Sequence, residues 1–88
     1  MKKKYKIRDI ATGLYQDADF DARVSDVSWS SAGKTWQDVE QLKKHINLLQ
    51  ECRIMISPLW EVIELQGNQE ERYPVMVLLA TNKSKKRI

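Results

Sequence analysis

The feature that most constrains the fold is one amphipathic stretch in the middle of the chain. Apolar side chains recur there at spacings of three and four residues, which places them on one side of an α-helix; they are Trp36, Val39, Leu42, Ile46 and Leu49. Thr35 is a good N-cap residue, and Asp38 follows three positions later in a variant of the capping box. The pattern predicts a helix from about Trp36 to Gln50 with one apolar face to cover.

Segments before the helix predict strands that cover this face. Residues 5–8 alternate apolar and basic side chains, as a half-buried strand does, and residues 14–16 form a short return strand. The loop between them, residues 9–13, contains the glycine that a hairpin of this length needs. We expect the acidic segment from Asp17 to Asp26 to be a loop. Residues 27–29 are then a third strand or an extended lead into the helix.

Two segments after the helix leave alternatives open. Residues 60–65 are rich in β-branched and aromatic side chains, which favours a strand. Ser57 and Pro58 would instead suit the first turn of a second helix over this region; we prefer the strand. The five consecutive apolar residues from Val75 to Leu79 predict another strand, either central or at an edge that meets a partner.

These elements predict an α+β fold, in which one amphipathic helix packs on a small antiparallel sheet. With 88 residues the chain has room for one domain, spanning residues 1–88. It has one cysteine, which fits a reducing cytosol. No apolar run approaches the roughly 20 residues that span a bilayer, and no signal-peptide core follows the basic N-terminus. We therefore expect a cytoplasmic protein with no membrane partner.

The net charge of +3 is unevenly distributed along the chain. Seven of the fifteen basic side chains lie in two basic tails, residues 1–4 and 83–88, which leaves eight basic against twelve acidic side chains between them. A nucleic-acid-binding domain should carry a basic stripe on its folded part. We therefore expect nucleic acid to bind only weakly, through the tails.

Candidate enzyme sites are incomplete. The triplet at residues 33–35, Gly-Lys-Thr, ends like a phosphate-binding loop, but Ser28 stands where the first glycine of that motif is required. His45 and Cys52 are the only residues of their types, and two helical turns separate them by roughly 10 Å, too far for a nucleophile and its base. We expect no enzyme activity, no catalytic residues and no cofactor.

A calcium site is incomplete as well. Asp17, Asp19 and Asp21 have the spacing of the first ligands of a calcium loop, but Ala22 and Ser28 stand where that loop needs glycine and glutamate. We therefore expect no metal site. The three aspartates form an acidic segment that can present negative charge to a basic partner.

The remaining candidates are positions for contact with another protein chain. Leu48 lies off the apolar stripe of the helix, on the same flank as His45. The 75–79 run would bury its uncovered face against a second copy of the chain, unless a second helix over residues 57–65 covers it within one chain. The candidate partner-binding residues are Asp17, Asp19, Asp21, His45, Leu48, Val75 and Val77.

Four short segments carry a resemblance to a known group. They are the Y-K-I-R strand at residues 5–8, the G-K-x-W turn at 33–36, the helix segment L-K-x-H-I at 42–46 and the W-E-V-I-E segment at 60–64. In this order they resemble the small accessory proteins of tailed bacteriophages, over about residues 5–65. The resemblance implies a phage origin, the cytoplasm of a bacterial host and no known chemistry.

The expected function follows from this resemblance. We expect a phage-encoded protein-binding accessory or inhibitor that blocks or redirects a host protein by occupying its surface. The first alternative is a small nucleic-acid-binding module that uses the basic tails, with Trp29 as a stacking residue. The second is a structural or oligomer-forming protein with no inhibitory role.

Overall fold

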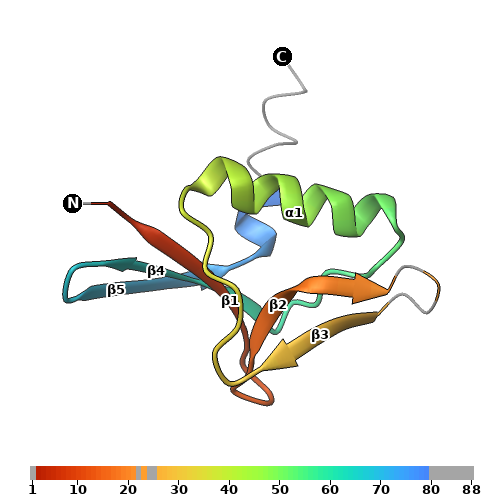
Figure 1. The fold of residues 1–88 in the computed structure, drawn as a ribbon, viewed down its shortest axis with the longest axis horizontal. Helices are drawn as coiled ribbons and strands as arrows, with labels where there is room; N and C mark the ends of the chain where they lie inside the picture. The colour runs from red at the N-terminus through yellow and green to blue at the C-terminus, as the bar shows by residue number, and fades with distance from the viewer. Residues whose placement is uncertain (1, 22, 24–25, 80–88) are drawn as a thin grey trace.

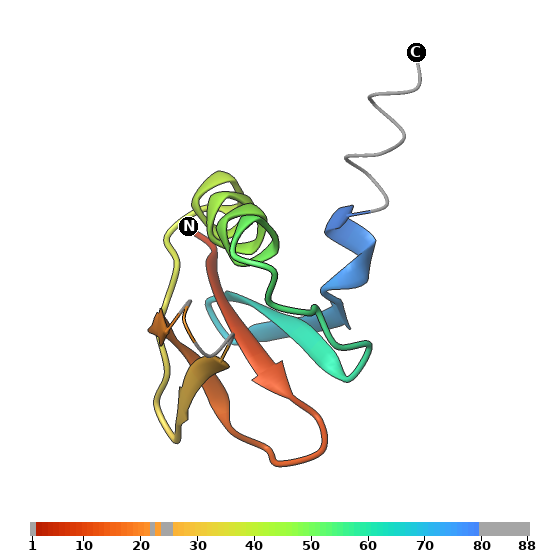
Figure 2. The same ribbon diagram turned by 90° about the vertical axis from the view of Figure 1, so that its right-hand side faces the viewer.

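Five strands form one antiparallel sheet in the order β3-β2-β1-β4-β5, and helix α1 packs on it (Figure 1). The structure is a computed structural model that describes residues 2–21, 23 and 26–79. A short helix at 76–79 lies on the same side of the sheet as α1 (Figure 2). The predicted α+β fold is confirmed. The elements are β1 (Lys4–Asp9), β2 (Tyr15–Asp21), β3 (Asp26–Ser30), α1 (Val39–Glu51), β4 (Trp60–Gln66) and β5 (Gln69–Pro74).

The core lies between α1 and the sheet. The helix buries Leu42, Ile46 and Leu49, three members of the stripe that the sequence predicted. They form one cluster with Ile7 of β1 and Val62 of β4, neighbours in the β1–β4 register. Each of these side chains is almost completely removed from water, because the helix and the sheet cover it from both sides.

Helix α1 begins at Val39, three residues later than predicted. Asp38 is the N-cap, and its side chain accepts a hydrogen bond from the Gln41 N–H at 2.8 Å. Trp36 cannot be helical because its backbone bonds to β1: the Tyr5 N–H donates to the Trp36 carbonyl at 2.9 Å and the Trp36 N–H donates to the Tyr5 carbonyl at 2.8 Å. This pairing keeps the chain extended before the helix, so Thr35 is not the cap.

The G-K-x-W turn joins two halves of the sheet. Strand β1 pairs along its whole length with β4 but with β2 only at Arg8 and Tyr15. Residues 33–36 lie where β1 and β2 diverge, and the Lys34 N–H donates to the Gln16 carbonyl at 2.9 Å. Gly33 has a φ of +69°, and a Cβ on it would lie 2.4 Å from the Tyr15 Cβ. This turn therefore has a structural role at the junction of β1 and β2.

The predicted acidic loop is wrong over most of its length. Residues 17–21 belong to β2, and Asp26 is the first residue of β3. The two strands pair through Phe20 and Val27, and both side chains pack on the core. The pairing and burial of Phe20 and Val27 thus outweigh the turn propensity of the aspartates in this segment. Ala22 lies outside the described residues.

The apolar run near the C-terminus is helical, so the predicted strand is wrong there. Val75 is 0% exposed and Leu78 is 7% exposed, whereas Val77 between them is 45% exposed. Buried positions three residues apart are typical of a helix, while a strand would bury alternate residues. Pro74 ends β5, and the Leu78 N–H then donates to the Val75 carbonyl at 3.0 Å.

These assignments change the expectation of a homodimer. The preferred strand over residues 60–65 is confirmed as β4, so no second helix forms there. The uncovered strand on which the dimer rested is absent too, because Val75 and Leu78 pack into the core of their own chain. The edge strands are instead β3 and β5, and residues 69–72 of β5 are polar or charged. Charged edge strands resist pairing with another chain.

Candidate protein-binding surface

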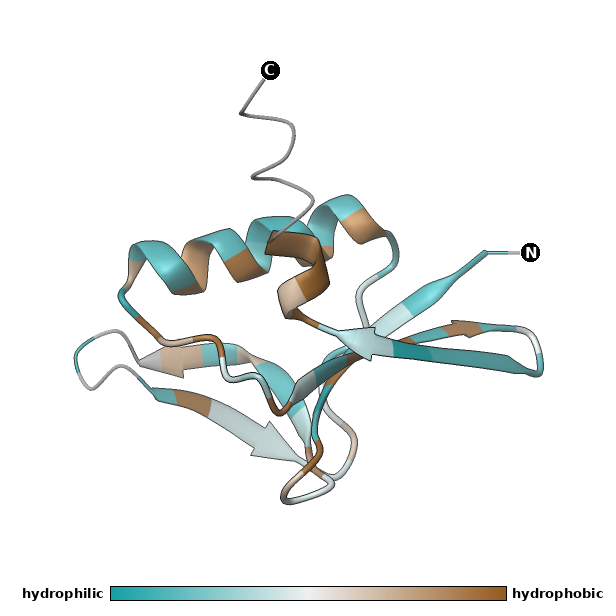
Figure 3. Cartoon of the chain, turned by 180° about the vertical axis from the view of Figure 1, so that it is seen from behind, coloured by the Kyte–Doolittle hydropathy of each residue, from teal (hydrophilic) through white to brown (hydrophobic). Residues whose placement is uncertain are grey.

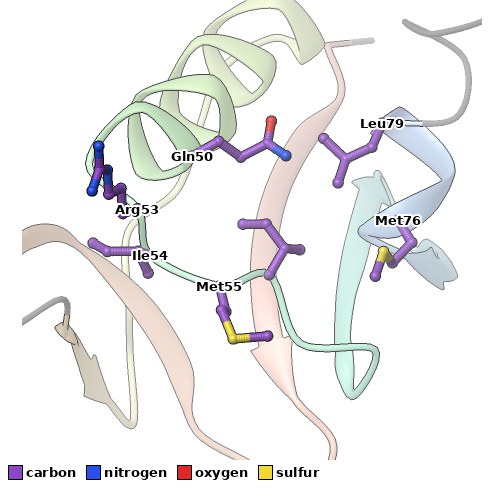
Figure 4. A pocket seen from close by; sticks show the side chains of 7 residues that line it. Gln50, Arg53, Ile54, Met55, Met76 and Leu79 are labelled. Carbon is purple, nitrogen blue, oxygen red and sulfur yellow. The ribbon is translucent and has the colours of Figure 1, made fainter.

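An open pocket of about 630 Å³ lies between the end of α1, the segment that follows it and the 76–79 helix (Figure 4). Figure 3 shows the 76–79 helix as a strongly hydrophobic segment beside α1. Gln50 and Leu79 extend toward each other from the two helices (Figure 4). The apolar side chains that line the pocket are Ile54, Met55, Ile56, Met76 and Leu79, and Gln50 and Arg53 are the polar ones.

The segment after α1 holds its apolar side chains at alternating depths. Ile54 and Ile56 are buried in the core, whereas Met55 between them is 86% exposed. Met76, on the facing helix, is 42% exposed. A methionine side chain is unbranched and polarizable, so it adapts to partners of different shape. The pocket therefore has a fixed apolar base and two adaptable side chains at the solvent boundary.

The end of α1 determines where Arg53 lies. The Arg53 N–H donates to the Gln50 carbonyl at 2.9 Å, and the Ile54 N–H donates to the Leu49 carbonyl at 2.9 Å. These two bonds define a Schellman motif, in which the residue after the C-cap adopts the left-handed conformation. Arg53 has a φ of +63° and is the one non-glycine residue with positive φ in the described part of the chain. Arg53 thus lines the edge of the pocket, with its guanidinium turned outward (Figure 4).

The pocket has a positive charge without an acidic counterpart. None of its lining residues is acidic. Arg53 is exposed, and its guanidinium forms no ion pair with a carboxylate among the residues that the structure describes. A guanidinium presents a planar set of N–H donors that matches a carboxylate. The surface can therefore bind an apolar group and an anionic group side by side.

The residues that the sequence predicted for partner binding do not form one surface. Asp17 accepts a hydrogen bond from the Ser30 hydroxyl at 2.8 Å, Asp19 is exposed on β2, and the side chain of Asp21 lies outside the description. Leu48 is exposed on α1, and Val77 is exposed on the 76–79 helix. The placement of Val75 is corrected, because this residue is buried in the core and cannot contact a partner.

His45 belongs to a half-buried polar pair on the inner side of α1. Its Nε2 lies 2.6 Å from Oε1 of Gln16, a residue of β2 that is completely buried. The His45 ring contacts the rings of Phe20 and Trp36, with centroids 6.3 and 4.8 Å apart. Burial lowers the pKa of His45 below its usual 6.5. Gln16 Nε2 has no hydrogen-bond partner among the residues that the structure describes. We assign His45 to packing, since its polar atom faces Gln16.

The face of the sheet opposite the helices carries mixed charge. Lys6 and Arg8 lie on it, in register with Ile63 and Glu61 of β4. Arg8 pairs with Glu61 at 3.2 Å, and the Lys6 ammonium lies 5.0 Å from the centre of the Tyr15 ring. The acidic partner reduces the field that nucleic acid would meet on this face.

The N-terminal basic tail is partly integrated into the fold. Lys4 is the first residue of β1, and Lys3 pairs with Glu64 at 3.1 Å. The hydrogen bond and the charge of Glu64 raise the pKa of Lys3. The second tail, residues 83–88, lies outside the described residues.

The described residues contain neither a metal-binding cluster nor a membrane-spanning helix. No group of three histidine, cysteine, aspartate or glutamate side chains in the described ranges could hold a metal ion. None of the helices that the structure describes has the length and apolar character needed to cross a bilayer.

Comparisons with known proteins do not assign the chain to a family. No family model, curated protein or solved structure matches it. What the structure defines is a small α+β domain with a five-stranded antiparallel sheet and two helices on one face, together with an open apolar pocket.

Sequence reasoning missed the residues of the pocket, although two signals pointed to them. The alternation in Ile54-Met55-Ile56 could have placed the methionine outward. The helix end was predicted at Gln50, close to its true position at Glu51. Arg53 was not recognised because a left-handed residue at this position is usually glycine.

Proposed function

We propose that this chain is a phage-encoded accessory protein that binds a host protein in the bacterial cytoplasm and blocks or redirects it by occupying its surface. The single observation that carries this proposal is the open pocket with exposed methionines next to Arg53, which forms no ion pair within the described part of the chain. The phage origin and the host target are supported by the sequence resemblance alone.

The chemistry of the pocket favours a protein partner over a reaction. Its lining offers apolar contact and one positive charge, without a nucleophile or a general base. Removing one methionine side chain from water contributes roughly 1.5–3 kcal/mol. Met55 and Met76 together can therefore supply a substantial part of the binding free energy, and no chemical step is needed for inhibition by occupancy.

The test compares capture of proteins from a bacterial lysate by three forms of the full-length chain. The wild type should retain a defined host protein, identified by mass spectrometry. Met55→Glu should lose it, because it places a carboxylate on the apolar surface. Ile10→Glu alters an exposed apolar residue of the β1–β2 loop, away from the pocket lining, and should retain the same protein. Absence of a retained protein, or equal capture by both variants, would contradict the proposal.

The alternative is a small nucleic-acid-binding module, for which the exposed Lys4 and the stacking of Lys6 on Tyr15 are the specific observations. Binding of this kind should be weak, carried by the basic tails and steeply reduced by salt. Deletion of residues 83–88 together with Lys2→Ala, Lys3→Ala and Lys4→Ala should remove it. If such a chain still bound a defined oligonucleotide at physiological salt, the nucleic-acid reading would replace the protein-binding one.

A further inference from the structure

Arg53 stands at a position where glycine is the usual residue. Only glycine adopts a positive φ without steric cost. About a third to a half of helices end with a residue in the left-handed conformation, and this residue is usually glycine. The Schellman motif at the end of α1 is complete in its hydrogen bonds, so the arginine side chain is not needed to close it. A cation near the helix C-terminus gains some energy from the helix dipole. Lysine or arginine on the last turn would gain it without the left-handed conformation.

The left-handed backbone has a consequence for the side chain. Arg53 lines the pocket at its edge, and its guanidinium extends away from the amide of Gln50, the other polar lining residue (Figure 4). Both side chains carry N–H donors, and arginine carries them in the fixed geometry that fits a carboxylate. Ile54 and Met55 follow directly in the sequence and supply the apolar part of the lining.

We infer that the pocket recognises a partner segment in which an acidic side chain stands beside a large apolar one. The carboxylate pairs with Arg53 at the edge of the pocket, and the apolar side chain enters between Met55 and Met76. This inference rests on the proposed protein-binding function and specifies its ligand. It assigns Arg53 to specificity and the two methionines to affinity.

The positive charge of Arg53 distinguishes between the segments that could occupy the pocket. The last nine residues of the chain, 80–88, contain four basic and no acidic side chains, so they lack the counterpart that Arg53 requires. A segment of another protein that carries an aspartate or glutamate beside an apolar anchor matches both parts of the lining. A second copy of this chain is the remaining occupant, and the oligomeric state tests it.

The experiment uses a yeast-displayed library of random 12-residue peptides and the full-length protein. Peptides selected by the wild type should combine aspartate or glutamate with large apolar residues. The Arg53→Glu variant should bind these peptides about tenfold or more weakly, since a charge-assisted hydrogen bond is lost and a repulsion is gained. It should select peptides with lysine or arginine in place of the acidic residue. Such a reversal cannot arise from misfolding.

A second variant and a second measurement make the test independent of folding defects. Arg53→Gly fits the left-handed backbone, so it should melt at a higher temperature than Arg53→Ala, while both bind the selected acidic peptides equally weakly. Sedimentation of the wild type should show a monomer. The inference is overturned if no peptides are enriched, if the acidic preference is missing or persists in Arg53→Glu, or if the chain forms a dimer that Arg53→Glu dissociates.

The outcomes separate this inference from the proposed function. If lysate capture is lost in Met55→Glu but survives in Arg53→Glu, the protein-binding function stands and the acidic partner segment is wrong. If the wild type retains no host protein but selects acidic peptides as described, the peptide chemistry stands and the host function is wrong.

Discussion

Two residues with positive φ have different tasks in this fold. Gly33 lies against the backbone of β2, where no side chain fits. Arg53 closes a helix and directs a long side chain to solvent and to the pocket. The same backbone conformation thus serves close packing at one site and side-chain placement at the other.

The conformational cost of Arg53 can be measured by comparing two uncharged replacements. Arg53→Gly should be more stable than Arg53→Ala by about 1 kcal/mol, because alanine keeps the steric cost of a positive φ and glycine does not. Both variants lose the interaction of the cation with the helix dipole, so this term cancels. Urea unfolding followed by circular dichroism gives the difference. Equal stability of the two variants would show that residue 53 is not left-handed.

His45 should make stability depend on pH. Burial lowers its pKa below 6.5, whereas the unfolded chain titrates near 6.5. Between the two pKa values the unfolded chain binds more protons, so stability is complete above about pH 6.5 and is lost as the pH falls toward the folded pKa. The free energy of unfolding should therefore decrease more from pH 7.5 to 5.5 in the wild type than in His45→Gln, which cannot titrate.

The single histidine also allows a direct measurement. An NMR titration of the folded chain reports one histidine and needs no assignment. A midpoint at or above 6.5, or equal pH dependence of the wild type and His45→Gln, would contradict the buried Gln16–His45 pair.

At the scale of elements, the seam between β1 and β2 depends on the close approach of the 33–36 turn. Gly33→Ala should destabilise the fold by roughly 2 kcal/mol or more, because it combines a positive φ with a Cβ 2.4 Å from Tyr15 Cβ. Gly13→Ala is the matched control: φ is +77°, but the nearest atom to the new Cβ is Arg8 Nη2 at 3.6 Å. It should cost only the conformational part, about 1 kcal/mol. If thermal unfolding showed that Gly13→Ala destabilises the fold as much as Gly33→Ala, the close approach of Gly33 to β2 would not be what stabilises the junction of β1 and β2.

The helical run at the C-terminal end of the described chain gives a second test. Leu78→Ala should destabilise by about 2 kcal/mol or more, since it removes a buried side chain, while Val77→Ala should change stability much less. Alternate burial in a strand would instead place Val75 and Val77 on the same face. The urea unfolding midpoints of the two variants distinguish a helix from a strand over residues 75–79. A larger loss of stability in Val77→Ala than in Leu78→Ala would support the strand.

Local sequence pattern predicted α1 and β4, but it missed most of β2, a strand of the same length as β4. The stripe of α1 and the β-branched content of β4 depend on local pattern alone, and both were predicted with ends close to the observed ones. The run at 75–79 has no polar residues to mark a face, so its period could not be read. Its conformation depends on Pro74, which ends β5, and on the packing of Val75 and Leu78 in the core that α1 covers.

The pocket was beyond prediction for a related reason. Its residues come from the end of α1, the segment after it and the 76–79 helix, and no local pattern joins them. Arg53 became informative only when its φ was known. The acidic residues of β2, in contrast, were read as a surface loop, because their spacing does not reveal the pairing of Phe20 with Val27.

At the scale of the whole molecule, the two sides of the sheet carry different features. The side of the sheet without helices carries basic and acidic side chains in pairs, such as Arg8 with Glu61. The opposite side carries α1 and the 76–79 helix (Figures 2 and 3), and residues of both helices line the pocket. A protein partner that seeks apolar contact would therefore approach the helical side, and polyanions would approach the ends of the chain.

The most direct test of this account is the position of the contact on the molecule. The chain is labelled with ¹³C at the methyl groups of methionine and isoleucine, and the host protein retained from the lysate is added. Met55 and Met76 line the pocket, and Ile10 does not. The account predicts that the methyl signals of Met55 and Met76 shift or broaden while that of Ile10 remains unchanged. Binding of the host protein that leaves both methionine signals unchanged would contradict it.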